Sequence, residues 1–131
     1  MAATGAHRPE SRPWAAPAIR ARGSRMTNLD WCREHLPDLS GKRALITGAA
    51  SGLGFETALG LASRGAEVIL ADRNVAGGHA AVERIRGLSP SARVEFREID
   101  LADLAFVRRF GDALTAEGRA LDIVINNAGI L

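Results

Sequence analysis

Four short apolar segments alternate along this chain with three segments of helical periodicity, and this alternation constrains the fold more than any other feature. The strand-like segments are residues 43–47, 67–71, 93–99 and 121–125. Between the first two, residues 53–64 repeat apolar side chains at positions i, i+3, i+4 and i+7, starting from Phe55, which is typical of a helix.

Two further helices are expected. The second begins near Val75 and is ended by Gly87 and Pro90. The third is expected to begin after Asp103, whose side chain can cap it. Its expected buried stripe consists of Leu104, Val107, Phe110 and Leu114.

Strands that alternate with helices of this length form βαβ units with right-handed crossovers. The pattern therefore predicts an α/β fold of the Rossmann type, a doubly wound parallel sheet with strand order 3-2-1-4, truncated after the fourth strand. The winding direction reverses between the first and fourth strands, so a ligand site is expected beyond the carboxyl ends of the strands. The fourth segment, residues 121–125, is nearly all apolar, which predicts a strand covered on both faces.

The chain divides into three regions. Residues 1–25 contain five arginines and one acid, a charge of +4, which leaves −2 of the total +2 for residues 26–131. This first region is expected to be a disordered basic extension, with a transit peptide or a true start at Met26 as alternatives. Residues 26–40 form a lead-in segment, in which Trp31 is expected to pack against the bottom of the domain. Because the basic charge lies in the extension, no nucleic-acid partner is expected.

Composition excludes several kinds of site. The chain has one cysteine, Cys32, so it has neither an intrachain disulfide nor a thiolate cluster. The histidines, His7, His35 and His79, are too scattered to suggest a metal site. No apolar run approaches the length needed to cross a membrane, so we expect a cytoplasmic protein without a membrane partner.

A glycine-rich turn follows the first strand. Gly48, Gly52 and Gly54 stand in a G-x-x-x-G-x-G spacing before the first helix. Gly48 permits a sharp turn, Gly52 leaves room for a diphosphate beside backbone N–H groups, and Gly54 lets the helix lie close to the sheet. The helix N-terminus favours an anion, and the hydroxyl of Ser51 can add a hydrogen bond. A phosphate-binding loop of the Gly-Lys-Ser/Thr type is excluded by Phe55.

Polar residues follow the other strands as well. Asp72, after the second strand, can hydrogen-bond both adenosine ribose hydroxyls and would repel a 2′-phosphate. The neighbouring Arg73 can instead stack on adenine or pair with a 2′-phosphate. Asp100-Leu101 follow the third strand, and Asn126-Asn127-Ala128-Gly129 follow the fourth.

Together these motifs resemble the front half of a short-chain dehydrogenase/reductase, from Gly41 to the end of the chain. The stretch PDLSGKRALITGAASGLG, followed by ADRN, most resembles the retinol-dehydrogenase-like branch of that family. The resemblance implies that residues 41–131 are a partial NAD(P)-binding domain. It also implies the role of each cofactor-binding residue.

In that family the glycine loop holds the cofactor diphosphate, here through Gly48, Ser51, Gly52, Leu53 and Gly54. Asp72, with Arg73 beside it, would meet the adenosine ribose and favour NAD, with NADP as the alternative. Asp100 and Leu101 would meet the adenine. Asn127, Ala128 and Gly129 would line the cofactor, and Asn126 would tie the fourth strand to its neighbours.

The family's chemistry uses a serine and a Tyr-x-x-x-Lys pair beyond the Asn-Asn-Ala-Gly turn. This chain contains no tyrosine, and its one lysine, Lys42, lies early in the sequence. No catalytic residue is therefore assigned, and the chain is expected to be inactive alone. Its parent reaction would be hydride transfer between a nicotinamide cofactor and an alcohol or carbonyl carbon.

Two other functions fit parts of the pattern. A non-catalytic dinucleotide-binding or partner protein would sense NAD(H) or pair with a full-length paralogue. A methyltransferase has a similar sheet and would also suit Asp72, but the Asn-Asn-Ala-Gly turn argues against it.

Overall fold

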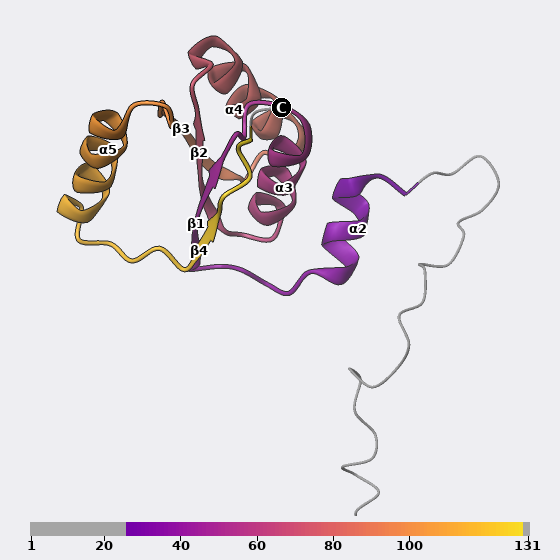
Figure 1. The fold of residues 1–131 in the computed structure, drawn as a ribbon. Coiled ribbons are helices and arrows are strands. Elements are labelled where there is room, and N and C mark those ends of the chain that lie inside the picture. Colours follow the sequence, from indigo (N-terminus) through magenta and orange to yellow (C-terminus); the bar gives the residue numbers. More distant parts are fainter. Residues whose placement is uncertain (1–25, 130–131) are drawn as a thin grey trace, which may run out of the picture.

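The computed structural model describes residues 26–129 and has helices on both faces of a parallel sheet (Figure 1). The strands are β1 (Arg43–Thr47), β2 (Glu67–Asp72), β3 (Arg93–Glu98) and β4 (Ile123–Ile125). Their order is β3-β2-β1-β4 and all pairings are parallel, which confirms the predicted topology. The basic extension expected at residues 1–25 lies outside the described part of the chain.

Four helices accompany the sheet. They are α2 (Asn28–His35), α3 (Gly52–Ser63), α4 (Val75–Leu88) and α5 (Leu104–Ala116). Helices α3 and α4 cover one face of the sheet, and α5 lies on the opposite face (Figure 1). The alternation of strand side chains explains both layers, since Ala44 and Ile46 of β1 pack beneath α3 and α4 while Leu45 faces α5.

The helices begin at residues that satisfy their exposed N–H groups. The Asn74 side chain accepts from the N–H of Gly77 at 2.9 Å, and Asp103 accepts from Ala105 at 3.0 Å. Helix α3 differs, because Ser51 stands at its N-cap and makes no capping hydrogen bond with its side chain. Ser51 and Leu53, at the N-terminus of α3, line the candidate site described below.

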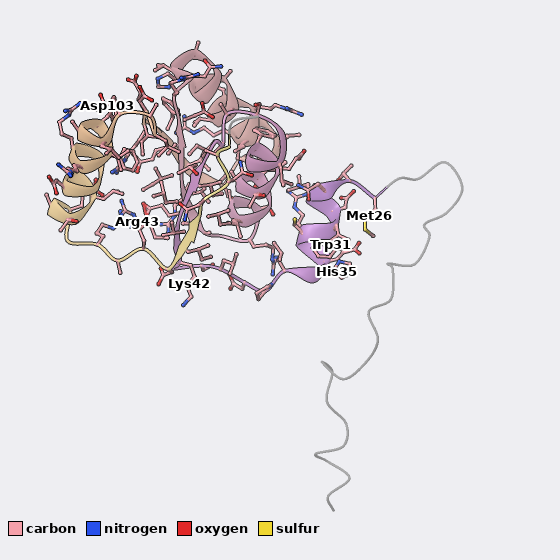
Figure 2. All side chains as sticks on the ribbon, viewed as in Figure 1. Met26, Trp31, His35, Lys42, Arg43 and Asp103 are labelled. Atoms are coloured by element: carbon pink, nitrogen blue, oxygen red, sulfur yellow. The ribbon has the colours of Figure 1, made fainter. Side chains whose placement is uncertain are left out.

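The lead-in segment contains a helix, α2, that the periodicity did not predict. Thr27 and Asp30 form a reciprocal capping box, a sequence signal that would have located this helix. Cys32 of α2 is buried against Gly60 of α3, where an added Cβ would lie 2.7 Å from the cysteine Sγ. Trp31, which was expected to pack against the domain, stacks on His35 of the same helix (Figure 2). The lead-in is attached instead through Cys32, through Leu29, which packs on the core, and through Asn28, whose side chain donates to the carbonyl of Glu56.

Two expectations about buried faces were wrong. Leu104 is 72% exposed, and Phe106 packs against the core of that face beside Phe110 and Leu114, which were predicted. Leu104 is the first residue of the helix and precedes the turn that lies against the sheet. Strand β4 is not covered on both faces, because Val124 is 52% exposed where α5 does not reach it. Among residues 26–129, no helix is both long enough and apolar enough to cross a bilayer.

Candidate functional site

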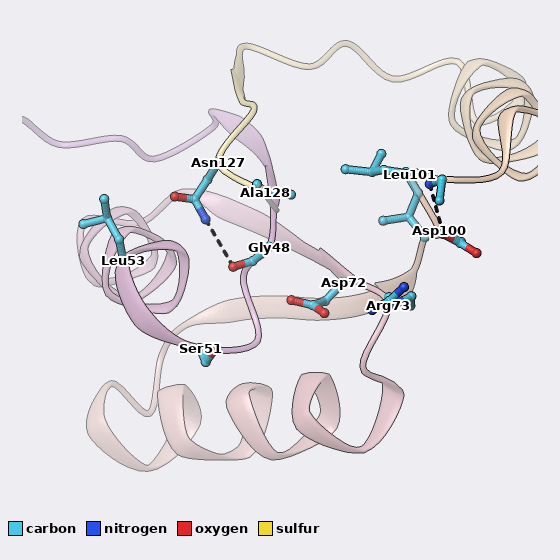
Figure 3. A pocket seen from close by; sticks show the side chains of 12 residues that line it. Gly48, Ser51, Leu53, Asp72, Arg73, Asp100, Leu101, Asn127 and Ala128 are labelled. Carbon is cyan, nitrogen blue, oxygen red and sulfur yellow. Dashed lines mark hydrogen bonds between the residues drawn. The ribbon is translucent and has the colours of Figure 1, made fainter. Parts of the chain in front are cut away.

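A cavity of about 700 Å³ lies at the carboxyl ends of the strands, where the winding of the sheet reverses (Figure 3). It is lined by Gly48, Ser51, Leu53, Asp72, Arg73, Ile99, Asp100, Leu101, Ala102, Asn127, Ala128 and Gly129. Every residue proposed from the sequence for cofactor binding is in this lining except Gly52 and Gly54. The sequence motifs that follow all four strands therefore meet in one place.

The glycine loop is shaped by three different requirements. Gly48 has φ +67°, and an added Cβ would lie 2.9 Å from the Cα of Ala128. Gly54 is buried, and its added Cβ would lie 2.3 Å from the carbonyl oxygen of Gly48, so it permits close packing of α3 on the loop. Gly52 has φ +60°, but an added Cβ there would meet nothing within 4 Å. The space above Gly52 is open, beside the uncapped N-terminus of α3.

Asp72 is held at the end of β2 by backbone groups on both sides. Its Oδ2 accepts from the N–H of Ala50 at 3.0 Å, and its Oδ1 accepts from the N–H of Asn74 at 2.9 Å. The carboxylate therefore links the glycine loop to the turn after β2. Arg73 is exposed and lies on the same side of the cavity as Asp100 (Figure 3).

The wall that follows β3 is a tight turn. The Oδ1 of Asp100 accepts from the N–H of Ala102 at 3.0 Å, and the carbonyl of Asp100 accepts from the N–H of Asp103 at 3.1 Å. Leu101 is 47% exposed at the cavity. This arrangement offers an apolar side chain beside a carboxylate.

Asn127 ties β4 to the glycine loop. Its Nδ2 donates to the carbonyls of Thr47 and Gly48, each at 3.2 Å. Figure 3 shows the bond to Gly48. The Thr47 hydroxyl in turn accepts from the N–H groups of Asn127 and Ala128, each at 3.1 Å. The sequence interpretation gave the tying role to Asn126, but Asn126 is exposed, and the neighbouring Asn127 has its side chain on the sheet side.

Sequence reasoning missed three residues of this site. Ile99 and Ala102 line the cavity on either side of the Asp100-Leu101 pair, and Thr47 holds the strand ends together. Ile99 and Ala102 flank a recognised motif, so extending the motif by one residue each way would have found them. Thr47 stands first in the glycine motif, but its role was not predicted, because that role depends on a partner 80 residues away. No group of three potential metal-ligating side chains occurs within the described residues.

The sheet order and the cavity at its switch point define a Rossmann-type α/β domain. The sequence model of the short-chain dehydrogenases matches residues 42–131. The chain belongs to the short-chain dehydrogenase family of oxidoreductases, as the motifs indicated.

Individual relatives agree with this assignment. Retinol dehydrogenase 12 of Homo sapiens is 44% identical over 100 residues, which are 76% of this chain and 31% of that protein. This similarity supports the placement of the chain in the retinol-dehydrogenase-like branch of the family. The chain thus spans about a third of the length of this curated relative.

Two solved structures illustrate the shared fold. Menthone neomenthol reductase from Mentha piperita is 39% identical with a TM-score of 0.62, over 68% of this chain and 32% of that one. The Pseudomonas aeruginosa RhlG/NADP active-site complex is 33% identical with a TM-score of 0.63, over 71% of this chain and 36% of that one.

Proposed function

We propose that this chain is the cofactor-binding part of an NAD(P)-dependent oxidoreductase and binds a nicotinamide dinucleotide in the cavity. The observation that carries the proposal is the open space at Gly52, which stands between Ser51 and Leu53 of the cavity lining. An added Cβ there would meet nothing within 4 Å, and Ser51 leaves α3 without a side-chain cap. A helix N-terminus with open space in front of it suits a diphosphate, because its N–H groups and partial positive charge face the anion.

The remaining walls fit the other parts of the same ligand. Asp72 presents a carboxylate beside the glycine loop, held in place by two backbone N–H groups, where it can accept hydrogen bonds from the adenosine ribose. Asp100 and Leu101 offer an acceptor and an apolar surface to the adenine. Beyond β4, Ala128 and Gly129 have little or no side chain to fill the cavity, so the nicotinamide end can lie there.

When bound, the nicotinamide ring supplies a hydride acceptor or donor. The parent reaction we propose is hydride transfer between that ring and an alcohol or carbonyl carbon. The residues of this chain bind and orient the dinucleotide, and Asn127 holds the loop and β4 together beneath it. Because the 131 residues include no tyrosine, we expect them to bind the dinucleotide without turnover.

A Gly52→Ala variant tests whether the open space is the diphosphate site. The new methyl group would fill the space that the diphosphate needs, so we expect NAD affinity to fall by about tenfold or more. Isothermal titration calorimetry of the chain with NAD and with NADP measures this. Gly41→Ala is the matched control, because Gly41 also has positive φ (+84°) and nothing within 4 Å of an added Cβ.

The two variants should have similar costs in stability, since each forces alanine into the left-handed region at about 1–2 kcal/mol. Only Gly52→Ala should lose affinity for the dinucleotide, while Gly41→Ala should keep that of the wild type. Equal dinucleotide affinity in both variants would place the diphosphate elsewhere and would contradict the proposal, as would the absence of dinucleotide binding by the folded wild-type chain.

A further inference from the structure

The sheet face beneath α5 carries a cluster of charged side chains in addition to its apolar core. Near the cavity this face is apolar, with Leu45, Ile69 and Ile99 packed against α5. Toward the amino ends of β1 and β2 and along the edge strand β3, it carries charges instead. These are Arg43 of β1, Glu67 of β2, and Glu95 and Arg97 of β3.

Glu117, which follows the last residue of α5 and caps it, lies between two of these arginines. One carboxylate oxygen lies 2.5 Å from Nη2 of Arg43, and the other lies 2.6 Å from Nη1 of Arg97. Arg43 points from β1 toward α5 (Figure 2), and its side chain is only 4% exposed. Hydrogen bonds from Arg97 and then from Arg43 lower the pKa of Glu117 to about 2, so it is charged at neutral pH. We call Arg43, Arg97 and Glu117 the Glu117 cluster.

The Glu117 cluster matters to α5 because the rest of its attachment is slight. None of the residues of α5 is fully buried. Its contact with the sheet consists of the half-buried Phe106, Phe110 and Leu114. Arg43 also keeps two buried nitrogens, Nε and Nη1, without a hydrogen-bond partner in the described part of the chain. Losing the Glu117 carboxylate would leave this buried cation with less compensation, which is costly.

The other end of α5 is continuous with the cavity wall. Asp103 caps the helix through the N–H groups of Ala105 and Phe106. The N–H of Asp103 donates to the carbonyl of Asp100, within the turn that lines the cavity. A displacement of α5 would therefore displace the turn at residues 100–102.

We propose that Glu117 is a positioning residue for the nucleotide site, because the Glu117 cluster holds α5 against the sheet and so fixes the cavity wall at residues 100–102. This inference rests on the proposed function, since it assigns residues 100–102 to the nucleotide. Coupling of two binding events is reciprocal, so a nucleotide held by that wall must also stabilise the docked position of α5.

Amide hydrogen exchange of the 131-residue chain, read by mass spectrometry with and without NAD, tests the coupling. The variant is Glu117→Gln, which keeps the shape of the side chain and removes its charge. The matched control is Glu83→Gln, because Glu83 also pairs with an arginine, Arg86, at 3.1 Å, but its side chain is 74% exposed. Peptides from α2 serve as an internal reference, since no residue of α2 lines the cavity and α2 lies beside α3, away from α5 (Figure 1).

In Glu117→Gln we expect exchange in α5 to accelerate by about tenfold or more, NAD affinity to fall by about fivefold, and saturating NAD to restore α5 protection. Glu83→Gln should match the wild type in all three respects. If α5 is released but NAD affinity stays within about twofold, Glu117 has only a structural role and the inference is wrong. Unchanged α5 exchange in Glu117→Gln would also overturn it.

Two further outcomes are separable. If Glu117→Gln fails to fold, the wild type by itself tests the coupling between the nucleotide and α5. NAD should then slow amide exchange in α5 and leave exchange in α2 unchanged. No change in α5 exchange would refute the coupling. Should the folded wild type bind no dinucleotide, the proposed function fails, and the comparison of α5 exchange between wild type and Glu117→Gln still decides whether the Glu117 cluster holds the helix.

Discussion

At the scale of single residues, the candidate site depends on groups that each satisfy a local physical requirement. Asp72 is an example, because its two oxygens already accept hydrogen bonds from the backbone of Ala50 and Asn74. The carboxylate is thus fixed in place as a negative charge at the cavity. A ligand that carries an additional phosphate at this point would meet that charge, while a ribose with free hydroxyls would donate to it.

We therefore predict that NAD binds more tightly than NADP, and that Asp72→Asn narrows the difference because it removes the repulsion. Titration calorimetry should show a preference of about tenfold in the wild type. Asp112→Asn, on the exposed surface of α5, removes an equal charge away from the cavity and should change neither affinity. Tighter binding of NADP than of NAD by the wild type would show that Arg73 outweighs Asp72.

At the scale of elements, close approaches between helices and their neighbours occur at glycines. Gly60 lets α2 approach α3, since an added Cβ would lie 2.7 Å from Sγ of Cys32. Gly78 does the same for α4 on β3, where an added Cβ would lie 2.1 Å from the ring of Phe96. Both glycines stand inside helices, where glycine itself lowers helix stability, so their value lies in packing.

We predict that Gly60→Ala destabilises the chain by about 1–3 kcal/mol, because the methyl group overfills the contact between α2 and α3. Urea unfolding followed by circular dichroism measures the change. Cys32→Ala removes the clashing sulfur, so the double variant Cys32→Ala/Gly60→Ala should be more stable than the sum of the single effects. Gly87→Ala, where an added Cβ meets nothing within 4 Å, should be neutral or slightly stabilising. If the changes in the free energy of unfolding simply add in the double variant, Cys32 does not limit the space at Gly60 and the prediction is wrong.

At the scale of the whole molecule, ion pairs connect segments that are distant in sequence. Arg43 and Glu117 are 74 residues apart, and Arg119 pairs with Glu67 across 52 residues. Hydrogen bonds from Arg119 lower the pKa of Glu67, as those from Arg97 and Arg43 lower that of Glu117 to about 2. In their charged form, these two carboxylates therefore stabilise the folded state.

The sign of the resulting pH dependence follows from linkage. A carboxyl group whose pKa is lower in the folded than in the unfolded chain stabilises the fold above its unfolded pKa, and this stability is lost as the pH falls toward the folded pKa. For Glu117 the interval runs from its ordinary value of 4.5 down to about 2. We predict that the urea midpoint falls steadily over this interval.

The Glu117→Gln variant should have a lower midpoint at neutral pH and a shallower fall in acid, because its neutral side chain takes up no proton. Urea titrations at pH steps between neutrality and acid measure both slopes. Parallel slopes in the variant and the wild type would show that other carboxylates account for the acid sensitivity.

Much of the fold and of the site could be predicted from sequence because the signals are local. The alternation of strand and helix periods gave the parallel sheet and its order, and the glycine spacing identified the loop at residues 48–54. The capping box that starts α2 was equally local, between Thr27 and Asp30, but it lies outside any repeating apolar pattern. Periodicity alone therefore does not predict a short helix whose buried residues do not repeat along an apolar stripe.

The sequence by itself determined which strands and turns form and which motifs gather at the carboxyl edge of the sheet, because periodicity, turn chemistry and crossover handedness require no knowledge of distant partners. Only the tertiary structure decided that Asn127 and not Asn126 ties β4 to the loop, and that Phe106 and not Leu104 faces the sheet. It alone joined Arg43 to Glu117. Such contacts depend on strand register and on the direction in which each helix lies, and both are settled when the layers pack together.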